Sequence, residues 1–322
     1  MTWHIDLKTI PGSLRSATVL LPFVFAAAMA NIASPLNEHQ RMTDGASGGD
    51  IVATQRDPYG RVCAPVMING KGPFSLIVDT GANRSAVTSE VARSLGLSVD
   101  ESAPMLLHGV TGNARVPSIR IESMSIGALK MAPENLPVVF DAVDGADGFL
   151  GLSGLTNRRL VIDLARNRIS ISPSSSGRVG PGYVRIPAEL SRLKMLIVNT
   201  RMQGILVKAI LDTGAEATIG NLAMQRTLTG QSLIANPPDR IVGTTSDVLF
   251  GRTVALPLIE LGSLRILGAR ISYSNLPIFD HFQLSTVPAM LVGMDVLGQF
   301  ESLAIDYRKA EVQLRPPNSS RR

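Results

Sequence analysis

The tetrapeptide Asp-Thr-Gly-Ala occurs twice in the chain, at Asp79–Ala82 and at Asp212–Ala215. Each copy closes a short apolar run of the kind that forms a β-strand. Two carboxylates that lie side by side cannot both ionise easily, so they share one proton. Such a pair can activate a bound water for attack on a peptide carbonyl, without a metal, a cofactor or a covalent intermediate. We therefore predict that Asp79 and Asp212 form a catalytic pair.

The two motifs lie inside a longer internal repeat. In each half the motif is followed by a glycine-bearing turn region, then an apolar pair with glycine, then Ile-Asp before a closing strand. These later elements are the turn regions 108–113 and 242–247, the apolar-Gly segments 146–155 and 289–298, and the Ile-Asp segments 160–164 and 303–307. A single shared turn is ordinary, but a shared order of elements predicts that both halves fold alike.

The elements that must position the carboxylates are predicted to be mostly strands. Short β-branched runs alternate with turn residues, and the 322 residues include 29 glycines and 20 prolines. This length is enough for two compact lobes with a core. Only two helices are indicated, Ser89–Leu95 ended by Gly96 and Leu222–Leu228 capped by Asn221. Each helix follows its Asp-Thr-Gly motif at a similar distance, which supports the repeat.

This layout resembles the aspartic protease clan, and within it the retropepsin-like branch with its bacterial, exported, single-chain members. The resemblance covers roughly residues 60 to 315. It implies an all-β fold of two homologous acid-protease lobes, which are β-barrels of the pepsin and retropepsin type with a few short helices. It also implies an active site at the lobe interface, and an aspartic-type endopeptidase whose partner is a polypeptide substrate.

The resemblance assigns supporting roles to the residues that complete the two motifs. These catalytic-loop residues are Thr80, Gly81, Ala82, Thr213, Gly214 and Ala215. The glycines allow a tight turn that a Cβ would obstruct, and the threonines are expected to bind backbone of the opposite lobe. The alanines stand where pepsin-like chains have Ser or Thr. A hydroxyl there would lower the carboxylate pKa by donating a hydrogen bond, which alanine cannot do.

The two glycine-bearing turn regions are expected to form flaps over the cleft, one from each lobe, as in retroviral dimers. Their candidate flap and substrate-binding residues are Gly109, Val110, Thr111, Gly112, Gly243, Thr244 and Thr245. Both regions lack the tyrosine of pepsin-like flaps. Simple loop mobility is the alternative interpretation of these turns.

The first 30 residues have the pattern of a secretory signal peptide. Lys8 and Arg15 precede the apolar stretch Ala17–Ala30, which ends in an A-x-A pattern. We expect cleavage before Asn31 and an exported, most simply periplasmic, protein. An uncleaved anchor facing the periplasm is the alternative, although the stretch is shorter than the roughly 20 residues of a spanning helix.

The predicted domain organisation follows from these signals. It comprises a signal peptide at 1–30, a flexible tether or propeptide at 31–57, lobe 1 at 58–173, an interlobe linker at 174–182, lobe 2 at 183–316 and a disordered tail at 317–322. Because one chain carries both halves of the site, we expect the active form to be a monomer.

Other classes of function find little support in the sequence. The four histidines have no metal-ligand spacing, and the single cysteine, Cys63, is expected to be a small buried apolar residue. The net charge of +5 comes from scattered basic residues, which does not favour nucleic-acid binding. A Gly-x-Ser-x-Gly match at Gly45–Gly49 lacks the flanking strand and helix of a serine hydrolase. A non-catalytic peptide-binding module is the remaining alternative, although both aspartates are present.

Overall fold

The computed structural model describes residues 3–7, 18–21, 25–26, 50–139, 145–155, 157–174, 180–191, 195–229, 239–243, 248–256 and 258–317. Within these residues the protein is mostly β, as predicted, and four α-helices accompany the strands. No helix among them is both long and apolar enough to cross a membrane. Below, the N-terminal half means described residues 50–174 and the C-terminal half means described residues 180–317.

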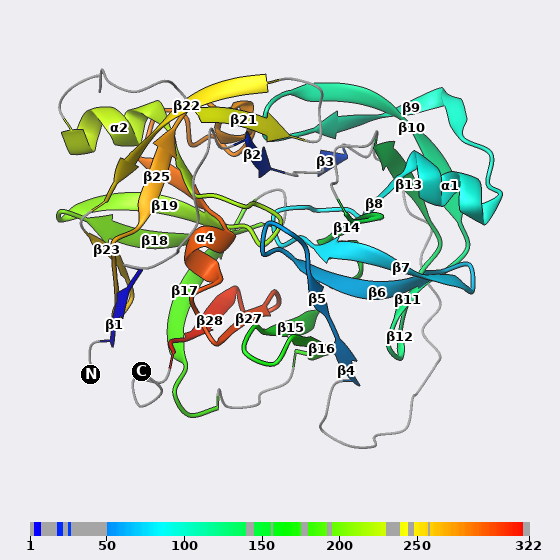
Figure 1. Ribbon diagram of the computed structural model, residues 1–322, viewed down its shortest axis with the longest axis horizontal. Coiled ribbons are helices and arrows are strands. Elements are labelled where there is room, and N and C mark those ends of the chain that lie inside the picture. The colour runs from blue at the N-terminus through cyan, green and yellow to red at the C-terminus, as the bar shows by residue number, and fades with distance from the viewer. Residues whose placement is uncertain are drawn as a thin grey trace.

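Most strands of the N-terminal half belong to one sheet, whose order is β12–β11–β6–β7–β14–β8–β13–β10–β9–β3, with β5 paired to β6 (Figure 1). The bounds are β3 Phe25–Ala26, β5 Gln55–Arg56, β6 Val62–Ile68, β7 Lys71–Val78, β8 Ala86–Thr88, β9 Asp100–His108, β10 Asn113–Ile121, β11 Met124–Ile126, β12 Leu129–Met131, β13 Glu134–Val139 and β14 Gly148–Leu150.

The strands of the C-terminal half pair in the same order, β24–β23–β18–β19–β26–β20–β25–β22–β21–β2, and β1 adds to β24. The bounds are β1 Trp3–Asp6, β2 Thr18–Leu21, β18 Leu196–Met202, β19 Ile205–Leu211, β20 Ile219–Gly220, β21 Asp239–Gly243, β22 Val248–Ala255, β23 Leu258–Leu261, β24 Leu264–Leu267, β25 Arg270–Tyr273 and β26 Ala289–Val292. The nine strands β6–β14 therefore correspond one by one to the nine strands β18–β26, and β3 corresponds to β2.

A ladder of six strands joins the two halves in the order β17–β28–β27–β15–β16–β4. The bounds are β4 Asp50–Ala53, β15 Arg158–Asp163, β16 Arg168–Pro173, β17 Val184–Leu190, β27 Ser302–Asp306 and β28 Glu311–Arg315. The two Ile-Asp segments form its central antiparallel pair, β15 with β27. In Figure 1 this ladder lies at the bottom, away from the β9–β10 and β21–β22 hairpins.

The strands that precede the two aspartates are buried in the middle of their sheets. β7 pairs with β6 on one side and in parallel with β14 on the other, and β19 pairs likewise with β18 and β26. The last residues of β7, Leu76–Val78, are fully buried apolar side chains. A strand covered on both faces needs such a continuous apolar run, and this run brings each Asp-Thr-Gly loop to the interior.

Both predicted helices are present, because their caps are local signals. α1 (Ser89–Leu95) begins after Thr88, whose hydroxyl accepts from Val91 N at 3.4 Å, and ends at Gly96 with φ 71°. α2 (Leu222–Thr229) begins after Asn221, whose side chain accepts from Met224 N at 2.8 Å. The shorter helices are η1 (Leu152–Gly154), α3 (Pro277–His281) and α4 (Met294–Leu297).

The range predicted as a flexible tether needs a correction at its C-terminal end. Asp50–Ala53 form β4, which pairs with β16, and Gln55–Arg56 form β5, which pairs with β6. Val52 packs against the main core, so this stretch contributes to the sheets. Residues 31–49 of the predicted tether, and residues 318–322 of the predicted tail, lie outside the described residues.

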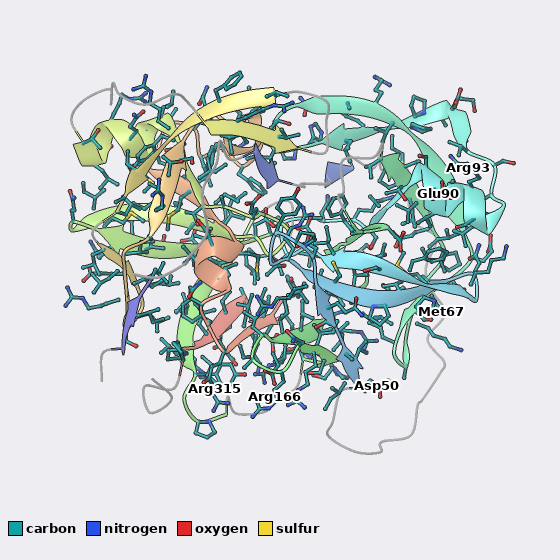
Figure 2. All side chains as sticks on the ribbon, in the orientation of Figure 1. Asp50, Met67, Glu90, Arg93, Arg166 and Arg315 are labelled. Carbon is teal, nitrogen blue, oxygen red and sulfur yellow. The ribbon has the colours of Figure 1, made fainter. Side chains whose placement is uncertain are left out.

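Charged side chains lie at the outer edges of the molecule (Figure 2). Glu90 and Arg93 form an exposed ion pair on α1, at the outer end of the N-terminal half. Asp50, Arg166 and Arg315 lie along the rim of the six-stranded ladder. Exposed pairs of this kind contribute little to stability, so the fold depends on its apolar core.

Candidate active site

Asp79 and Asp212 follow equivalent strands, and the same bonds hold both of them. Asp79 N donates to the carbonyl oxygen of Leu150 at 3.0 Å, and Asp212 N donates to that of Val292 at 3.0 Å. Both aspartates are completely buried. Each candidate carboxyl therefore sits where β7 or β19 ends beside its parallel neighbour, β14 or β26.

The apolar-Gly segments fit tightly against the motif loops. A Cβ added to Gly151 would lie 2.4 Å from backbone atoms of Arg84, and one added to Gly293 would lie 2.6 Å from backbone atoms of Ala217. Only glycine allows this approach. Further bonds close the contact: Leu152 N donates to Ala82 O at 3.0 Å, and Met294 N donates to Ala215 O at 2.8 Å.

Thr80 and Thr213 tie the two halves together with reciprocal hydrogen bonds. The Thr80 hydroxyl donates to Leu211 O at 2.7 Å and accepts from Thr213 N at 3.1 Å. The Thr213 hydroxyl donates to Val78 O at 2.5 Å and accepts from Thr80 N at 3.2 Å. All four contacts are buried, and each joins one half to the other. The threonines thus hold the two motif loops against each other.

The Asp79 carboxyl lies against the second motif loop inside this frame. A Cβ on Gly214 would lie only 2.6 Å from Asp79 Cγ, so the first carboxyl packs directly on the second motif loop. Gly81 N donates to Asp79 Oδ1 at 2.7 Å, and Gly214 N donates to Asp212 Oδ1 at 2.8 Å. The remaining oxygen of each carboxyl, Oδ2, is buried and has no hydrogen-bond partner in the described part of the chain.

This environment favours the protonated form of both aspartates. Burial raises the pKa of Asp79 well above its usual value, and the neighbouring Asp212 carboxyl raises it further. Burial also raises the pKa of Asp212, to about 7, while the N–H groups of Gly214 and Ala215 oppose the shift. Because the two groups titrate as a pair, a proton that they share belongs to both.

We expect the buried pair to make the protein less stable as the pH rises. The pKa of the Asp212 carboxyl in the folded protein, about 7, exceeds its value of 3.8 in the unfolded chain. Its contribution to the stability of the fold is therefore fully present below pH 3.8 and is lost as the pH rises to 7. Asp212→Asn removes this loss, so it should raise the free energy of unfolding more at pH 8 than at pH 4, by on the order of a few kcal/mol. Urea unfolding at both pH values measures the difference.

The control for this prediction is Asp100→Asn. Asp100 is exposed, and hydrogen bonds from Ser102 lower the pKa of its carboxyl. Its replacement should therefore give no gain in stability at pH 8. Equal effects of Asp212→Asn at the two pH values would contradict the proposed desolvation of the pair.

Arg61 is a buried charge close to the pair that sequence analysis did not identify. Its Nε lies 2.5 Å from Asp57 Oδ2, and the side chain is completely buried. Its Nη1 and Nη2 have no hydrogen-bond partner within the described ranges. The positive charge lowers the pKa of both Asp79 and Asp212, which partly offsets their burial. An isolated arginine has no sequence pattern, so only its spacing from Asp57 could have drawn attention to it.

The candidate flap residues of the N-terminal half form a closed hairpin turn. Gly109–Gly112 connect β9 to β10, Gly109 N donates to Gly112 O at 2.7 Å, and all four residues are buried. At the base of this turn, His108 stacks on His281 of α3, with ring centroids 4.3 Å apart. The hairpin therefore contacts the other half of the protein, a contact that sequence analysis did not anticipate.

The candidate flap residues of the C-terminal half are only partly described. Gly243 is the last residue of β21 and is buried. Thr244 and Thr245 lie outside the described residues. The hairpin of β21 with β22 occupies the same position in its sheet as the β9–β10 hairpin.

Two further observations concern the alternative chemistries, a metal site and a cysteine nucleophile, within the described residues. Among the described residues no cluster of His, Cys, Asp and Glu has the arrangement of a metal site. Cys63 is buried, and burial raises the pKa of its thiol, so it has the surroundings of an apolar core residue and not of a nucleophile.

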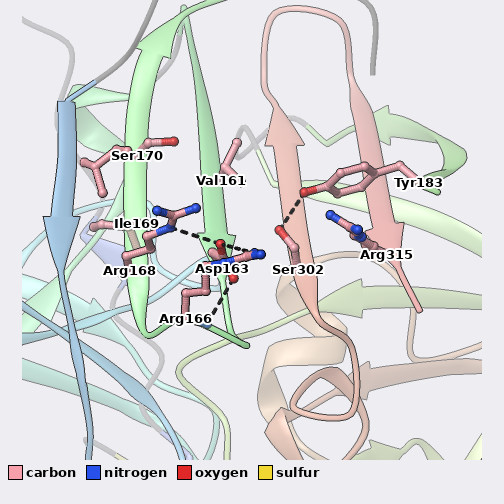
Figure 3. Close-up of a pocket in the computed structure, with 10 residues that line it drawn as sticks. Val161, Asp163, Arg166, Arg168, Ile169, Ser170, Tyr183, Ser302 and Arg315 are labelled. Carbon is pink, nitrogen blue, oxygen red and sulfur yellow. Dashed lines mark hydrogen bonds and ion pairs between the residues drawn. The ribbon is translucent and has the colours of Figure 1, made fainter. Parts of the chain in front are cut away.

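A hollow of about 210 Å³ opens on the six-stranded ladder (Figure 3). Its lining includes Asp163 and Arg168, whose Nε lies 3.0 Å from Asp163 Oδ2, and Arg166, which also pairs with Asp163. None of the predicted site residues lines it. This hollow is therefore a surface feature separate from the candidate active site.

Comparison with known proteins supports an aspartyl protease family. The family model described as Aspartyl protease matches residues 64–153, a range that runs from β6 into η1. The match includes Asp79, the β9–β10 hairpin and the apolar-Gly segment of the N-terminal half. No curated protein matches the chain.

Proposed function

We propose that this protein is a retropepsin-like aspartic endopeptidase in which each half of one chain supplies one catalytic carboxyl. The observation that carries the proposal is the pair of buried aspartates, Asp79 and Asp212, held together by the reciprocal bonds of two threonines. The match of residues 64–153 to an aspartyl protease family supports the same assignment for the N-terminal half.

The mechanism follows from one proton shared by two carboxyls. The ionised member accepts a proton from a water bound between Asp79 and Asp212, and the protonated member donates to the oxygen of the scissile carbonyl. The water oxygen attacks the carbonyl carbon, and a tetrahedral diol forms. Each Oδ1 is already engaged by its loop glycine, so the two Oδ2 atoms are the oxygens that handle the water and the carbonyl.

The remaining parts of the proposal concern assembly and location. Both carboxyls belong to one chain and the six-stranded ladder joins its halves, so the active form is a monomer. The basic-apolar-AxA pattern of residues 1–30 makes it an exported, periplasmic protein, and an anchor facing the periplasm is the alternative. The β9–β10 and β21–β22 hairpins serve as the two flaps.

Digestion of a proteome-derived peptide library tests the proposed activity. The purified full chain and residues 31–322 are incubated in parallel with the library, and new termini are read by mass spectrometry. Internal cleavage of peptides, absent when Asp79 is replaced by Asn, is the expected result. Peptide binding without any cleavage would instead identify a non-catalytic peptide-binding module.

We predict a bell-shaped pH dependence of kcat/KM whose optimum lies between the two raised pKa values of the pair, and therefore well above that of pepsin. Catalysis needs one proton on the pair, and the buried alanines at 82 and 215 offer no hydroxyl to stabilise the ionised form. The raised pKa values of the pair therefore move both limbs above those of pepsin, whose pair titrates at about 1.5 and 4.7.

Substituting the alanines tests the cause of this shift. Ala82→Thr and Ala215→Thr, with Ala→Ser as the smaller replacement at each position, should move the acid limb to lower pH. The measurement is a pH–rate profile of kcat/KM for each variant. A wild-type optimum below pH 3, or an acid limb that none of the variants moves, would refute the argument.

A further inference from the structure

Two short strands from the first 30 residues pair with the two flap hairpins. β2 pairs in parallel with β21, up to the pair Leu21↔Gly243. β3 pairs antiparallel with β9, beginning at Phe25↔His108. β9 and β21 are equivalent strands of the two sheets, so residues 18–21 and 25–26 pair at the same position in the two halves. In the view of Figure 1, β2 lies below β21 and β3 lies below the β9–β10 hairpin.

The spacing of β2 and β3 in the sequence suits pairing with two neighbouring hairpins. Leu21 and Phe25 are four residues apart, a distance that an extended chain spans with at most about 14 Å. β2 is parallel to β21 and β3 is antiparallel to β9. A single peptide strand that ran past both hairpins would show this combination if β9 and β21 ran in opposite directions.

The chemistry of the segment suits this position. Residues 18–26 read Thr-Val-Leu-Leu-Pro-Phe-Val-Phe-Ala and contain no charged side chain, so no charge would have to be desolvated when such a sequence binds to a sheet edge. An extended peptide binds a sheet edge through main-chain hydrogen bonds, and one edge accepts only one strand. A substrate that pairs with β9 and β21 would need the backbone groups that this segment already uses.

We propose that β2 and β3, residues 18–21 and 25–26, occupy the peptide-binding position in the full-length chain, so that the precursor is latent until the predicted signal peptide is removed. This inference rests on the proposed function. Because the segment belongs to the same chain, its effective concentration at the hairpins is high, on the order of millimolar for a flexible tether. A substrate must displace it, so latency raises the apparent KM more than it lowers kcat.

Disulfide trapping in the full-length chain tests the pairing without reference to activity. Phe25→Cys with His108→Cys places two thiols at a directly opposed pair, whose Cα separation of about 4.5–5.5 Å permits a disulfide. Phe25→Cys with Asn113→Cys is the matched control, because Asn113 pairs with His108 from the far side of β9. Phe25 and Asn113 are therefore two strand spacings apart, about 9.5 Å, which exceeds the reach of a disulfide.

The two variants are oxidised in parallel, and the crosslink is assigned by peptide mass, with the buried Cys63 left in place. A disulfide in the His108 variant and none in the Asn113 variant is the expected result. Equal crosslinking in both variants, or none in either, would overturn the proposal whatever the activity of the protein.

Peptide hydrolysis by the full-length chain tests the latency. Leu20→Pro removes one backbone N–H from β2 and should raise kcat/KM about tenfold, mainly through a lower KM. Ala28→Pro, outside both strands, is the control and should leave kcat/KM unchanged. Equal kcat/KM for the wild-type chain, Leu20→Pro and residues 31–322 would overturn the latency. If the Phe25→Cys and His108→Cys disulfide forms but neither the full-length chain, Leu20→Pro nor residues 31–322 cleaves peptides, the proposed function is refuted and the strand pairing stands.

Discussion

Replacing either Asp79 or Asp212 by asparagine is expected to reduce peptide hydrolysis by orders of magnitude while the protein stays folded. The pair works as one unit, because the shared proton and the bound water need both carboxyls. The amide has nearly the same shape as the carboxyl and cannot carry the negative charge. Steady-state kinetics on a peptide from the library, at the pH optimum of the wild type, measures the loss.

The controls for these variants separate chemistry from folding. Asp100→Asn replaces an exposed acid on β9 and should keep wild-type kcat/KM. Denaturant unfolding should show that the two active-site variants are as stable as the wild type or more so, since each removes a buried carboxyl. Statine inhibitors of the pepstatin type should compete with substrate in the wild type. Wild-type turnover by either asparagine variant would disprove the two-carboxylate mechanism.

Thr213→Val should destabilise the protein and disable the site together. The substitution keeps the shape of the side chain and removes the hydroxyl that serves Val78 O and Thr80 N. Two buried backbone groups then lose their partners, at about 1–3 kcal/mol each. We expect the free energy of unfolding to fall by about 2 to 6 kcal/mol. Peptide hydrolysis should fall with it, because the loops that carry the carboxyls are no longer tied.

Thr227→Val is the matched control, since the Thr227 hydroxyl donates to a backbone carbonyl within α2, at 2.8 Å from Ala223 O, and does not join the halves. Thr227→Val should lower the free energy of unfolding much less than Thr213→Val does, and it should leave the rate of peptide hydrolysis unchanged. Thr80→Val should reproduce the effect of Thr213→Val, and the double variant should lose less than the sum of the two. A Thr213→Val protein with the stability and activity of the wild type would contradict the role of these bonds.

The parts of the fold that sequence analysis predicted are those with local causes. Gly96 and Asn221 act on neighbouring backbone, so both helices could be predicted from local end signals. Gly151 and Gly293 are required by close backbone contact, and their place after an apolar pair is visible in the sequence. The repeat predicted that both halves fold alike, but it did not predict the order of the strands in each sheet.

The parts that sequence analysis missed depend on residues far apart in the chain. The effect of Arg61 on the pair arises because the fold buries it near both carboxyls, and no spacing encodes this. The stack of His108 on His281 joins a hairpin to a helix of the other half. Residues 18–21 were interpreted from composition as part of a signal peptide, and composition cannot say which sheet edge an apolar segment pairs with.

A double-mutant cycle on kcat/KM tests the central claim most directly, namely that one carboxyl from each half forms a single catalytic unit. Wild type, Asp79→Asn, Asp212→Asn and the double variant are compared on one peptide at one pH, after each has been checked for folding. The account predicts that the double variant is no less active than either single variant, because the first substitution already disables the pair. Losses that multiply in the double variant would show that the two aspartates act independently and would contradict the account.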